Sequence, residues 1–361
     1  MSNVIPETRI IQGERLDRPM NHSATQRRAV GTATDESERH TPVVLMGMPR
    51  SGTTWIGKIL DSSPRTLYRH EPDSYGRLNA LPLAPRVSDW REHAEDVSTF
   101  FASVAGARDT KIAGSAPVFS KDYQHALQAL WNTAAVFGTK GLTRFMGEMQ
   151  VPLWLPRGNP DGYRLVVKSI ESLPRSGVIA RALPHARLIL LLRNPYGFIA
   201  SMLRGKSQGL FSDSGSIGED LKLLGLLVEA DEEGHDITLE ALGDATPAQR
   251  LAWQWVLSND KALRDTEACD NVAAIRYEDV CADPLGATER LFAACDLPLT
   301  EQTRRFIRSS TGGHRDRYYS VYKDPLKAAN AWRSELSSDV VDSIRPILAR
   351  SRAGSLYADD L

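Results

Sequence analysis

Cysteine is scarce in this chain. Its three cysteines, Cys269, Cys281 and Cys295, are odd in number and far apart, and no two of them show the CxxC spacing. Disulfide-stapled domains and structural zinc sites need more cysteines at closer spacing. We therefore expect neither a disulfide framework nor a zinc site, and the reducing cytoplasm is the simplest location.

Long apolar runs and an excess of charge of either sign are also lacking. The first residues contain no apolar stretch typical of a secretory signal, and runs such as 188–192 are far too short to span a bilayer. Lysine and arginine (44) nearly balance aspartate and glutamate (45), for a net charge of −1. The balanced charge excludes a broad basic surface, so we expect no nucleic-acid partner. Because the apolar runs are short, we also expect no stable membrane insertion.

The chain does contain alternating strand and helix patterns. Residues 1–40 are polar and aperiodic, which predicts a flexible tail, and residues 41–361 are expected to form a single domain with helical insertions at about 72–160 and 205–250. Apolar runs predict strands at 41–48, 163–169, 187–193 and 272–279. Helices are predicted at 53–63, 121–137, 194–203 and 247–263. The alternation predicts an α/β fold with a parallel sheet flanked by helices on both faces.

The segment GMPRSGTT, from Gly47 to Thr54, has the spacing of a phosphate-binding loop (P-loop). It joins a predicted buried strand to a predicted helix, which is the context that such a loop requires. Backbone N–H groups of the turn and of the helix start then converge on an anion. An ordinary strand–helix turn is the alternative, and the hydroxyl groups of Thr53 and Thr54 argue against it.

The loop departs from that of a nucleotide kinase. Thr53 stands where a kinase has the lysine that contacts the β- and γ-phosphates, and the cation of this loop, Arg50, comes earlier. The apolar run LILLL ends in Arg193, where a kinase would place an aspartate that helps to hold Mg²⁺. An arginine can instead bind a second phosphate. These residues favour an anionic nucleotide bound without a metal.

Four segments, in the expected order along residues 43–336, resemble the family of sulfotransferases that use 3′-phosphoadenosine 5′-phosphosulfate (PAPS). The segments are PRSGTTW (49–55), LILLLRNPYGFIASMLRG (188–205), IRYEDVCADP (275–284) and AWRSEL (331–336). They are similar to the 5′-phosphosulfate loop, the 3′-phosphate motif, the YED segment and the C-terminal Trp-basic segment of that family. The first two together are specific. Arg50 is typical of the carbohydrate-type and bacterial branches, since the cytosolic enzymes usually have lysine there.

The resemblance implies a PAPS site with PAP as the product and no metal. It assigns the phosphosulfate to the loop and helix start, at Arg50, Ser51, Gly52, Thr53 and Thr54. Arg193 and Ser201 take the 3′-phosphate-contacting positions, and the interval of eight residues places Ser201 about two turns into the following helix. Trp55 and Tyr277 are candidates for the adenine, although both also fit core positions. Lys323 and Arg333 are candidates for a lid over the 3′-phosphate, with simple solvation as the alternative.

Transfer to an acceptor hydroxyl requires a base. The stretch VVKSIESLP (166–174) resembles the segment that carries a catalytic histidine in the cytosolic enzymes, but Ile170 stands at that position. YRHEPDS (68–74) resembles the acidic segment that follows the loop helix in the carbohydrate-type and bacterial branches. Glu71 matches its acidic residue and is therefore the expected base, with a solvated turn residue before Pro72 as the alternative.

Three neighbouring residues complete the expected catalytic site. His70 is the second candidate for the base and is expected to point away from Glu71, and Glu171 is a third and is expected to be exposed. Lys168 is either a second cation at the sulfuryl group or the partner of a carboxylate at the strand end. Arg50 and the N–H groups of residues 51–54 are expected to stabilise the charge that develops on the transferring group.

The resemblance implies transfer of a sulfuryl group from PAPS to a hydroxyl of a sugar or another small molecule. Two alternatives remain open. A P-loop kinase or phosphotransferase would need Mg²⁺ and ATP, and a non-catalytic protein would bind PAP or PAPS without turnover. The insertions at 72–160 and 205–250 are expected to shape the acceptor pocket, because specificity lies in loops over a fixed core.

Overall fold

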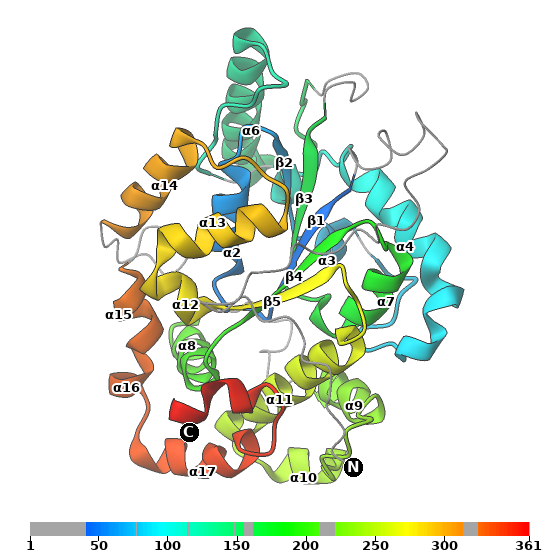
Figure 1. The fold of residues 1–361 in the computed structure, drawn as a ribbon, viewed down its shortest axis with the longest axis vertical. Coiled ribbons are helices and arrows are strands. Elements are labelled where there is room, and N and C mark those ends of the chain that lie inside the picture. The colour runs from blue at the N-terminus through cyan, green and yellow to red at the C-terminus, as the bar shows by residue number, and fades with distance from the viewer. Residues whose placement is uncertain are drawn as a thin grey trace, which may run out of the picture.

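A computed structural model describes residues 41–76, 78–113, 116–147, 149–154, 162–209, 221–312 and 324–360. Its centre is one parallel sheet of five strands in the order β2-β3-β1-β4-β5 (Figure 1). The strands are β1 (Val43–Met46), β2 (Thr66–His70), β3 (Arg164–Ser169), β4 (Arg187–Leu192) and β5 (Val272–Arg276). Helices cover both faces of the sheet, so the predicted α/β fold is confirmed.

Alternate residues of the central strands supply two separate cores. Val44 and Met46 of β1 pack into the core under α4 (Trp90–Val104), α7 (Ser176–Ala182) and α11 (Pro247–Thr266). Val43 and Leu45 point to the other face, under α2 (Thr53–Asp61), α13 (Pro284–Ala294) and α14 (Glu301–Thr311). The period of two along an entirely apolar strand is what a sheet buried on both faces requires.

The predicted starts of α8 and α11 are confirmed by their capping residues, whereas the helix predicted at 121–137 begins only at Ala126. Asn194 caps α8 (Pro195–Ser207), and its Oδ1 accepts hydrogen bonds from the N–H groups of Tyr196 (3.0 Å) and Gly197 (3.3 Å). Pro195 occupies the first helical position, where its missing N–H costs nothing. At the start of α11, Thr246 and Gln249 form a reciprocal capping box.

Two parts of the sheet differ from the prediction. Strand β2 was not predicted, because the polar residues Arg69 and His70 interrupt its apolar pattern. Arg69 is nevertheless buried, since its guanidinium donates to the carbonyl groups of Val104 (3.3 Å) and Ala105 (2.6 Å). The strand predicted at 272–279 ends at Arg276, and α12 (Tyr277–Ala282) begins there. Acidic residues in the first turn favour that helix start.

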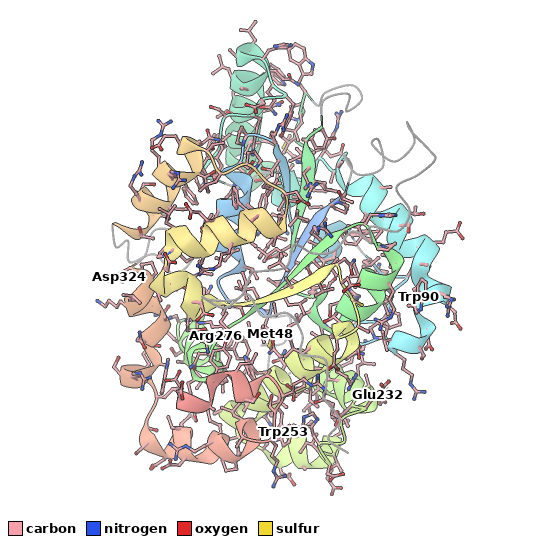
Figure 2. All side chains as sticks on the ribbon, viewed as in Figure 1. Met48, Trp90, Glu232, Trp253, Arg276 and Asp324 are labelled. Atoms are coloured by element: carbon pink, nitrogen blue, oxygen red, sulfur yellow. The ribbon has the colours of Figure 1, made fainter. Side chains whose placement is uncertain are left out.

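The remaining helices belong to the insertions and to the C-terminal part. They are α3 (Pro72–Gly76), α5 (Thr110–Ala113), α6 (Ala126–Met146), α9 (Leu221–Glu229), α10 (Leu239–Asp244), α15 (Pro325–Asn330), α16 (Trp332–Glu335) and α17 (Ser338–Leu348). Short 3₁₀ helices span Val87–Asp89, Leu173–Arg175 and Gly354–Asp360. Met48 lies at the centre of the molecule, and Trp90 and Asp324 lie at opposite edges (Figure 2). Among the described helices, none has both the length and the apolar character needed to cross a membrane.

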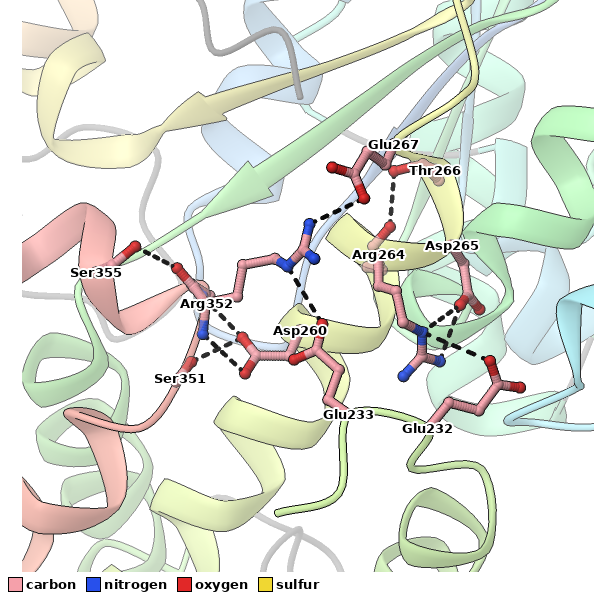
Figure 3. Close-up of polar contacts among 12 residues, drawn as sticks. Glu232, Glu233, Asp260, Arg264, Asp265, Thr266, Glu267, Ser351, Arg352 and Ser355 are labelled. Atoms are coloured by element: carbon pink, nitrogen blue, oxygen red, sulfur yellow. Dashed lines mark hydrogen bonds and ion pairs between the residues drawn. The ribbon is translucent and has the colours of Figure 1, made fainter. Parts of the chain in front are cut away.

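A buried ion network ties the C-terminal segment to α11 (Figure 3). The carboxylate of Asp260 accepts hydrogen bonds from the Ser351 hydroxyl (2.7 Å) and from the N–H groups of Arg352 (3.0 Å) and Ala353 (2.8 Å). A fourth contact comes from Nε2 of His235, at 3.1 Å. These four contacts occupy both oxygens of the carboxylate. We therefore interpret the neighbouring group Glu233, His235 and Asp260 as an ion network, although its ligand atoms lie within 4.8 Å of one another.

His235 makes this network sensitive to pH. Its other nitrogen, Nδ1, lies 2.9 Å from Oδ1 of Asp231, so the ring bridges two carboxylates. The hydrogen bond to Asp260, followed by that to Asp231, raises the pKa of His235 from 6.5 to about 9, against the opposing effect of burial. Because the pKa is higher in the folded state, the stabilisation is complete below about pH 6.5 and is lost as the pH rises through about 9.

We expect His235→Gln to lower the free energy of unfolding by about 1–2 kcal/mol at pH 6, after allowance for solvent screening, and by much less at pH 9.5. Urea unfolding of both proteins at the two pH values measures the difference. His185→Gln is a matched control on an exposed surface histidine. A His235→Gln effect of the same size at both pH values would show that the charge of His235 does not contribute.

Candidate active site

The carboxyl ends of all five strands lie at one edge of the sheet, and at each end lies a residue that the sequence analysis singled out. Glu71 follows β2, Lys168 is near the end of β3 and the loop of Arg50 follows β1. Arg193 follows β4 and Tyr277 follows β5. Ligands of open parallel α/β sheets bind outside this edge. The strand order thus places the loop in the middle, with Glu71 and Lys168 on one side and Arg193 and Tyr277 on the other.

The loop between β1 and α2 has a backbone that few residues other than glycine adopt. Gly52 caps α2 with φ +88°, and no described side chain forms a capping hydrogen bond with this helix end. The ring of Tyr277 lies directly over Gly52, so that a Cβ atom at Gly52 would be 2.4 Å from Cε2 of Tyr277. Ser51 and Thr53 are buried beside it. The uncapped start of α2 therefore offers its N–H groups to an anion.

Arg50, from the loop motif, lies together with Arg193 and Ser201, from the 3′-phosphate motif. Nε of Arg50 donates to the Ser201 hydroxyl at 3.1 Å. The guanidinium of Arg193 donates to the carbonyl groups of Arg50 and of Ala328, the latter at 3.1 Å. Arg193 is only 9% exposed, and its Cζ lies 5.2 Å from the centre of the Tyr277 ring. Among the described residues, its buried Nε has no hydrogen-bond partner, which leaves one donor for a ligand.

Glu71 and Lys168 form a buried ion pair on the other side of the loop. Nζ of Lys168 contacts Oε1 of Glu71, and the N–H of Glu71 donates to the Lys168 carbonyl at 2.7 Å. Glu71 is 8% exposed and Lys168 is 2% exposed. Burial lowers the pKa of Lys168, and the neighbouring carboxylate opposes this shift. Glu71 is therefore not a solvated turn residue, and Lys168 is the partner of a carboxylate at the strand end.

The two other candidates for the base differ in position. His70 was expected to point away from Glu71, and this is wrong: its Nε2 lies 3.6 Å from Oε1 of Glu71. The positive φ of Glu71 (+50°) breaks the alternation of side chains that the expectation assumed. Burial, followed by the charge of Lys168, lowers the pKa of His70 to about 3, so the ring is neutral and a weak base. Glu171 is exposed, as expected.

Backbone strain coincides with two of the predicted catalytic residues. Of the described residues other than glycine, Arg50 (φ +68°), Glu71 (+50°), Asp236 (+52°) and Asp296 (+50°) have positive φ. Such conformations cost of order 1–3 kcal/mol and cluster at functional sites. The site therefore contains two strained residues, one within the phosphate-binding turn and one beside it.

The sequence analysis missed a polar cluster beside Glu71. Asp73 is 6% exposed and accepts hydrogen bonds from the hydroxyl groups of Ser169 and Ser172, the latter at 2.6 Å. These bonds fix the turn after β2 against the end of β3. The signal in the sequence was only that short polar residues follow the two strands, which is also true of many surface turns.

The side chains of the remaining candidates Trp55, for the adenine, and Arg333, for the lid, have polar partners outside the phosphate-binding loop. Trp55 is 8% exposed, and its Nε1 donates to the Ser310 hydroxyl at 3.0 Å, as in a core residue. The side chain of Arg333 is 57% exposed and pairs with Asp360, whose other oxygen accepts from Nδ2 of Asn194 at 2.8 Å. Arg333 is thus linked to the start of α8. Lys323 lies outside the described residues.

Comparisons with known proteins identify the family of this chain. The model of a family described as the sulfotransferase family matches residues 42–301. Over 72 residues, 19% of the chain, the sequence is 33% identical to carbohydrate sulfotransferase 5 of Mus musculus and 32% identical to carbohydrate sulfotransferase 1 of Danio rerio. The matched segment spans only 18% and 17% of those two proteins.

Solved structures of sulfotransferases also align with this chain. The sulfotransferase domain from the curacin biosynthetic pathway has a TM-score of 0.40 at 15% identity, over 86% of this chain and 98% of that one. Sulfotransferase STF9 from Mycobacterium avium has 0.38 at 15%, over 90% and 77%. Mouse sulfotransferase SULT7A1 complexed with PAP has 0.41 at 10%, over 88% of both chains.

Proposed function

Because the chain belongs to the sulfotransferase family, we propose that it transfers a sulfuryl group from PAPS to a hydroxyl group of a sugar or another small molecule and releases PAP. Membership of the sulfotransferase family supports PAPS as the sulfuryl donor. The two carbohydrate sulfotransferases matched over 72 residues support a sugar hydroxyl as the acceptor. Three free cysteines suit a reducing compartment, and we propose the cytoplasm.

The observation that carries this proposal is the arrangement of Arg193. Its guanidinium is buried beside the phosphate-binding loop, and among the described residues its Nε lacks a partner. A buried donor without a partner costs about 1–3 kcal/mol, which a bound phosphate would recover. Ser201 lies within reach of the same loop through its contact with Arg50. These residues fit a nucleotide with two separate anionic groups, as PAPS has.

In this proposal PAPS supplies a sulfuryl group on a stable leaving group. The protein binds and orients PAPS and neutralises its charge. Arg50 and the N–H groups of Ser51, Gly52, Thr53 and Thr54 hold the phosphosulfate and the charge that develops there. Arg193 and Ser201 hold the 3′-phosphate. Tyr277 and Trp55 remain candidates for the adenine side, and Lys323 and Arg333 for a lid.

Glu71 is the proposed base. Its carboxylate accepts the proton of the acceptor hydroxyl, and the ion pair with Lys168 fixes the direction of that carboxylate. Lys168 also places a cation beside the loop. His70, with a pKa of about 3, accepts a proton poorly and serves instead as a neighbour of the carboxylate.

We propose that residues 41–361 act as one sulfotransferase domain whose insertions select the acceptor. A hollow of about 350 Å³ lies beside Pro72, the residue after Glu71. Phe100, Val104 and Ile112 line it with apolar surface, and Arg108 with charge. All four belong to the 72–160 insertion, which supports this hollow as a candidate acceptor pocket.

Calorimetric titration with PAP and with ATP–Mg²⁺, each with and without EDTA, tests the donor. We expect micromolar or tighter binding of PAP, unchanged by EDTA, and at least tenfold weaker binding of ATP–Mg²⁺. Preference for ATP–Mg²⁺ would instead favour a phosphotransferase. PAP binding without sulfuryl transfer to any hydroxyl compound in a broad screen would favour a non-catalytic binding protein.

A further inference from the structure

Helix α6 packs in the opposite sense to an ordinary surface helix. Its inward face is largely polar: Gln128, Asn132 and Thr139 are 6–9% exposed, together with Val136 at 7%. The amide side chains of Gln128 and Asn132 bind the backbone of Trp154 at 2.7–3.1 Å. The inward face thus resembles the polar side of a normal amphipathic helix.

The outward face of α6 is apolar. Positions 127, 130, 131, 134, 137, 138, 141 and 142 recur every three or four residues and therefore form one stripe along the helix. Trp154 flanks the stripe on the adjoining segment. The large exposed apolar residues of this surface, which we call the α6 stripe, are Leu127 (77%), Leu130 (68%), Trp131 (53%), Phe137 (51%), Leu142 (49%) and Trp154 (58%).

The size of the α6 stripe matches one half of a protein interface. Its six large side chains expose on the order of 700 Å², given about 150–250 Å² for each large side chain. Monomeric soluble proteins rarely expose apolar patches above a few hundred Å². A stable dimer buries about 800 Å² on each partner. The helix stands at the end of the molecule opposite α17, where a second molecule can reach it (Figure 1).

The middle of the stripe indicates what covers it. Ala134, Gly138 and Gly141 form a shallow strip between larger side chains, and a Cβ atom added at either glycine would meet nothing within 4 Å. A helix that lies in a lipid surface buries its largest side chains at the centre of the apolar face. Small residues at the centre instead allow the backbone of another helix to approach closely, with large side chains packing on either side.

We propose that α6 is the interface of a homodimer, in which the stripes of two copies of this chain cross near Gly138. A two-fold axis between the two α6 helices makes the stripe its own partner, so the large side chains of one copy lie over the small residues of the other. Between Asp122 and Glu148 the chain has no acidic residue, and none of the eight positions of the stripe carries a charge. No like charges therefore face one another at the centre.

Light scattering of the full chain at tens of micromolar tests the proposal. We expect twice the monomer mass for the wild type, and a dissociation constant raised at least tenfold by Leu130→Glu with Phe137→Glu. Leu285→Glu, on the exposed face of α13, is the matched control and should remain dimeric. Circular dichroism checks that the variants fold, which we expect because the substituted side chains are exposed.

Cross-linking identifies the surface directly. In a Cys269→Ser background, in which Cys281 and Cys295 are buried, Ala134→Cys, Gly138→Cys or Gly141→Cys should form an intermolecular disulfide on oxidation, and Leu285→Cys should not. A monomeric wild type, or a dimer that none of the α6 variants weakens or cross-links, overturns the proposal. So does a monomer that binds phosphatidylglycerol vesicles and loses this binding in the glutamate variant, since the stripe would then cover a lipid surface.

Discussion

Glu71→Gln is expected to lower kcat by at least ~100-fold while changing the Kd for PAP by less than about threefold. Glutamine has the size of glutamate but cannot accept the acceptor proton. The loop that is proposed to hold the nucleotide lies on the other side of Lys168 and keeps its contacts. Single-turnover sulfuryl transfer measures the rate, and calorimetry with PAP measures the affinity.

The substitution also leaves Lys168 buried beside a neutral partner, so its effects on stability and on chemistry must be separated. Glu171→Gln is the control, since Glu171 follows the same strand as Lys168 but is exposed, and it should retain nearly full activity. His70→Gln should lower kcat by less than tenfold, because a ring with a pKa of about 3 accepts a proton poorly. A folded Glu71→Gln enzyme with normal turnover would rule out Glu71 and leave His70 and Glu171 as candidates.

The sequence predicted the parts of this molecule that depend on local patterns. The apolar runs of β1 and β4 predict strands that are buried on both faces. The Asn194-Pro195 pair is a strong signal for the start of a helix. The spacing of Gly47, Gly52 and the two threonines similarly predicts an anion-binding turn. In each of these places the physical cause lies within a few residues of its effect.

The remaining features depend on contacts between distant segments. Arg69 can lie inside β2 only because carbonyl groups more than thirty residues away accept from it. The positive φ of Glu71, which brings His70 and Glu71 together, follows from the junction of β2 with β3 and not from a glycine signal. For α6, the apolar pattern predicted a helix at 121–137, whereas α6 spans Ala126–Met146 and turns a polar face inward, because amide side chains bind the backbone of Trp154.

Arg193→Ala is expected to raise the Kd for PAP at least ~30-fold, or about 2 kcal/mol, because a charge-assisted contact to the 3′-phosphate is lost. The Kd of Arg193→Lys for PAP should lie between those of the wild type and of Arg193→Ala, since lysine keeps the charge but lacks the planar guanidinium. Arg276→Ala is the matched control: this arginine ends the neighbouring strand β5 but is paired with Asp279 at 2.7 Å. Calorimetric titration of the four proteins measures the effect.

A loss of affinity in Arg193→Ala has two possible causes, because the same guanidinium also holds the carbonyl groups of Arg50 and Ala328. Adenosine 5′-phosphate, which differs from PAP only by the 3′-phosphate, separates them. If Arg193 binds the 3′-phosphate, the substitution weakens PAP alone and abolishes its advantage over adenosine 5′-phosphate. If Arg193 only supports the loop, both ligands weaken equally and the advantage persists, and the 3′-phosphate must then be bound elsewhere. The ratio of the two affinities therefore decides the role of Arg193 even if the loop itself is disturbed.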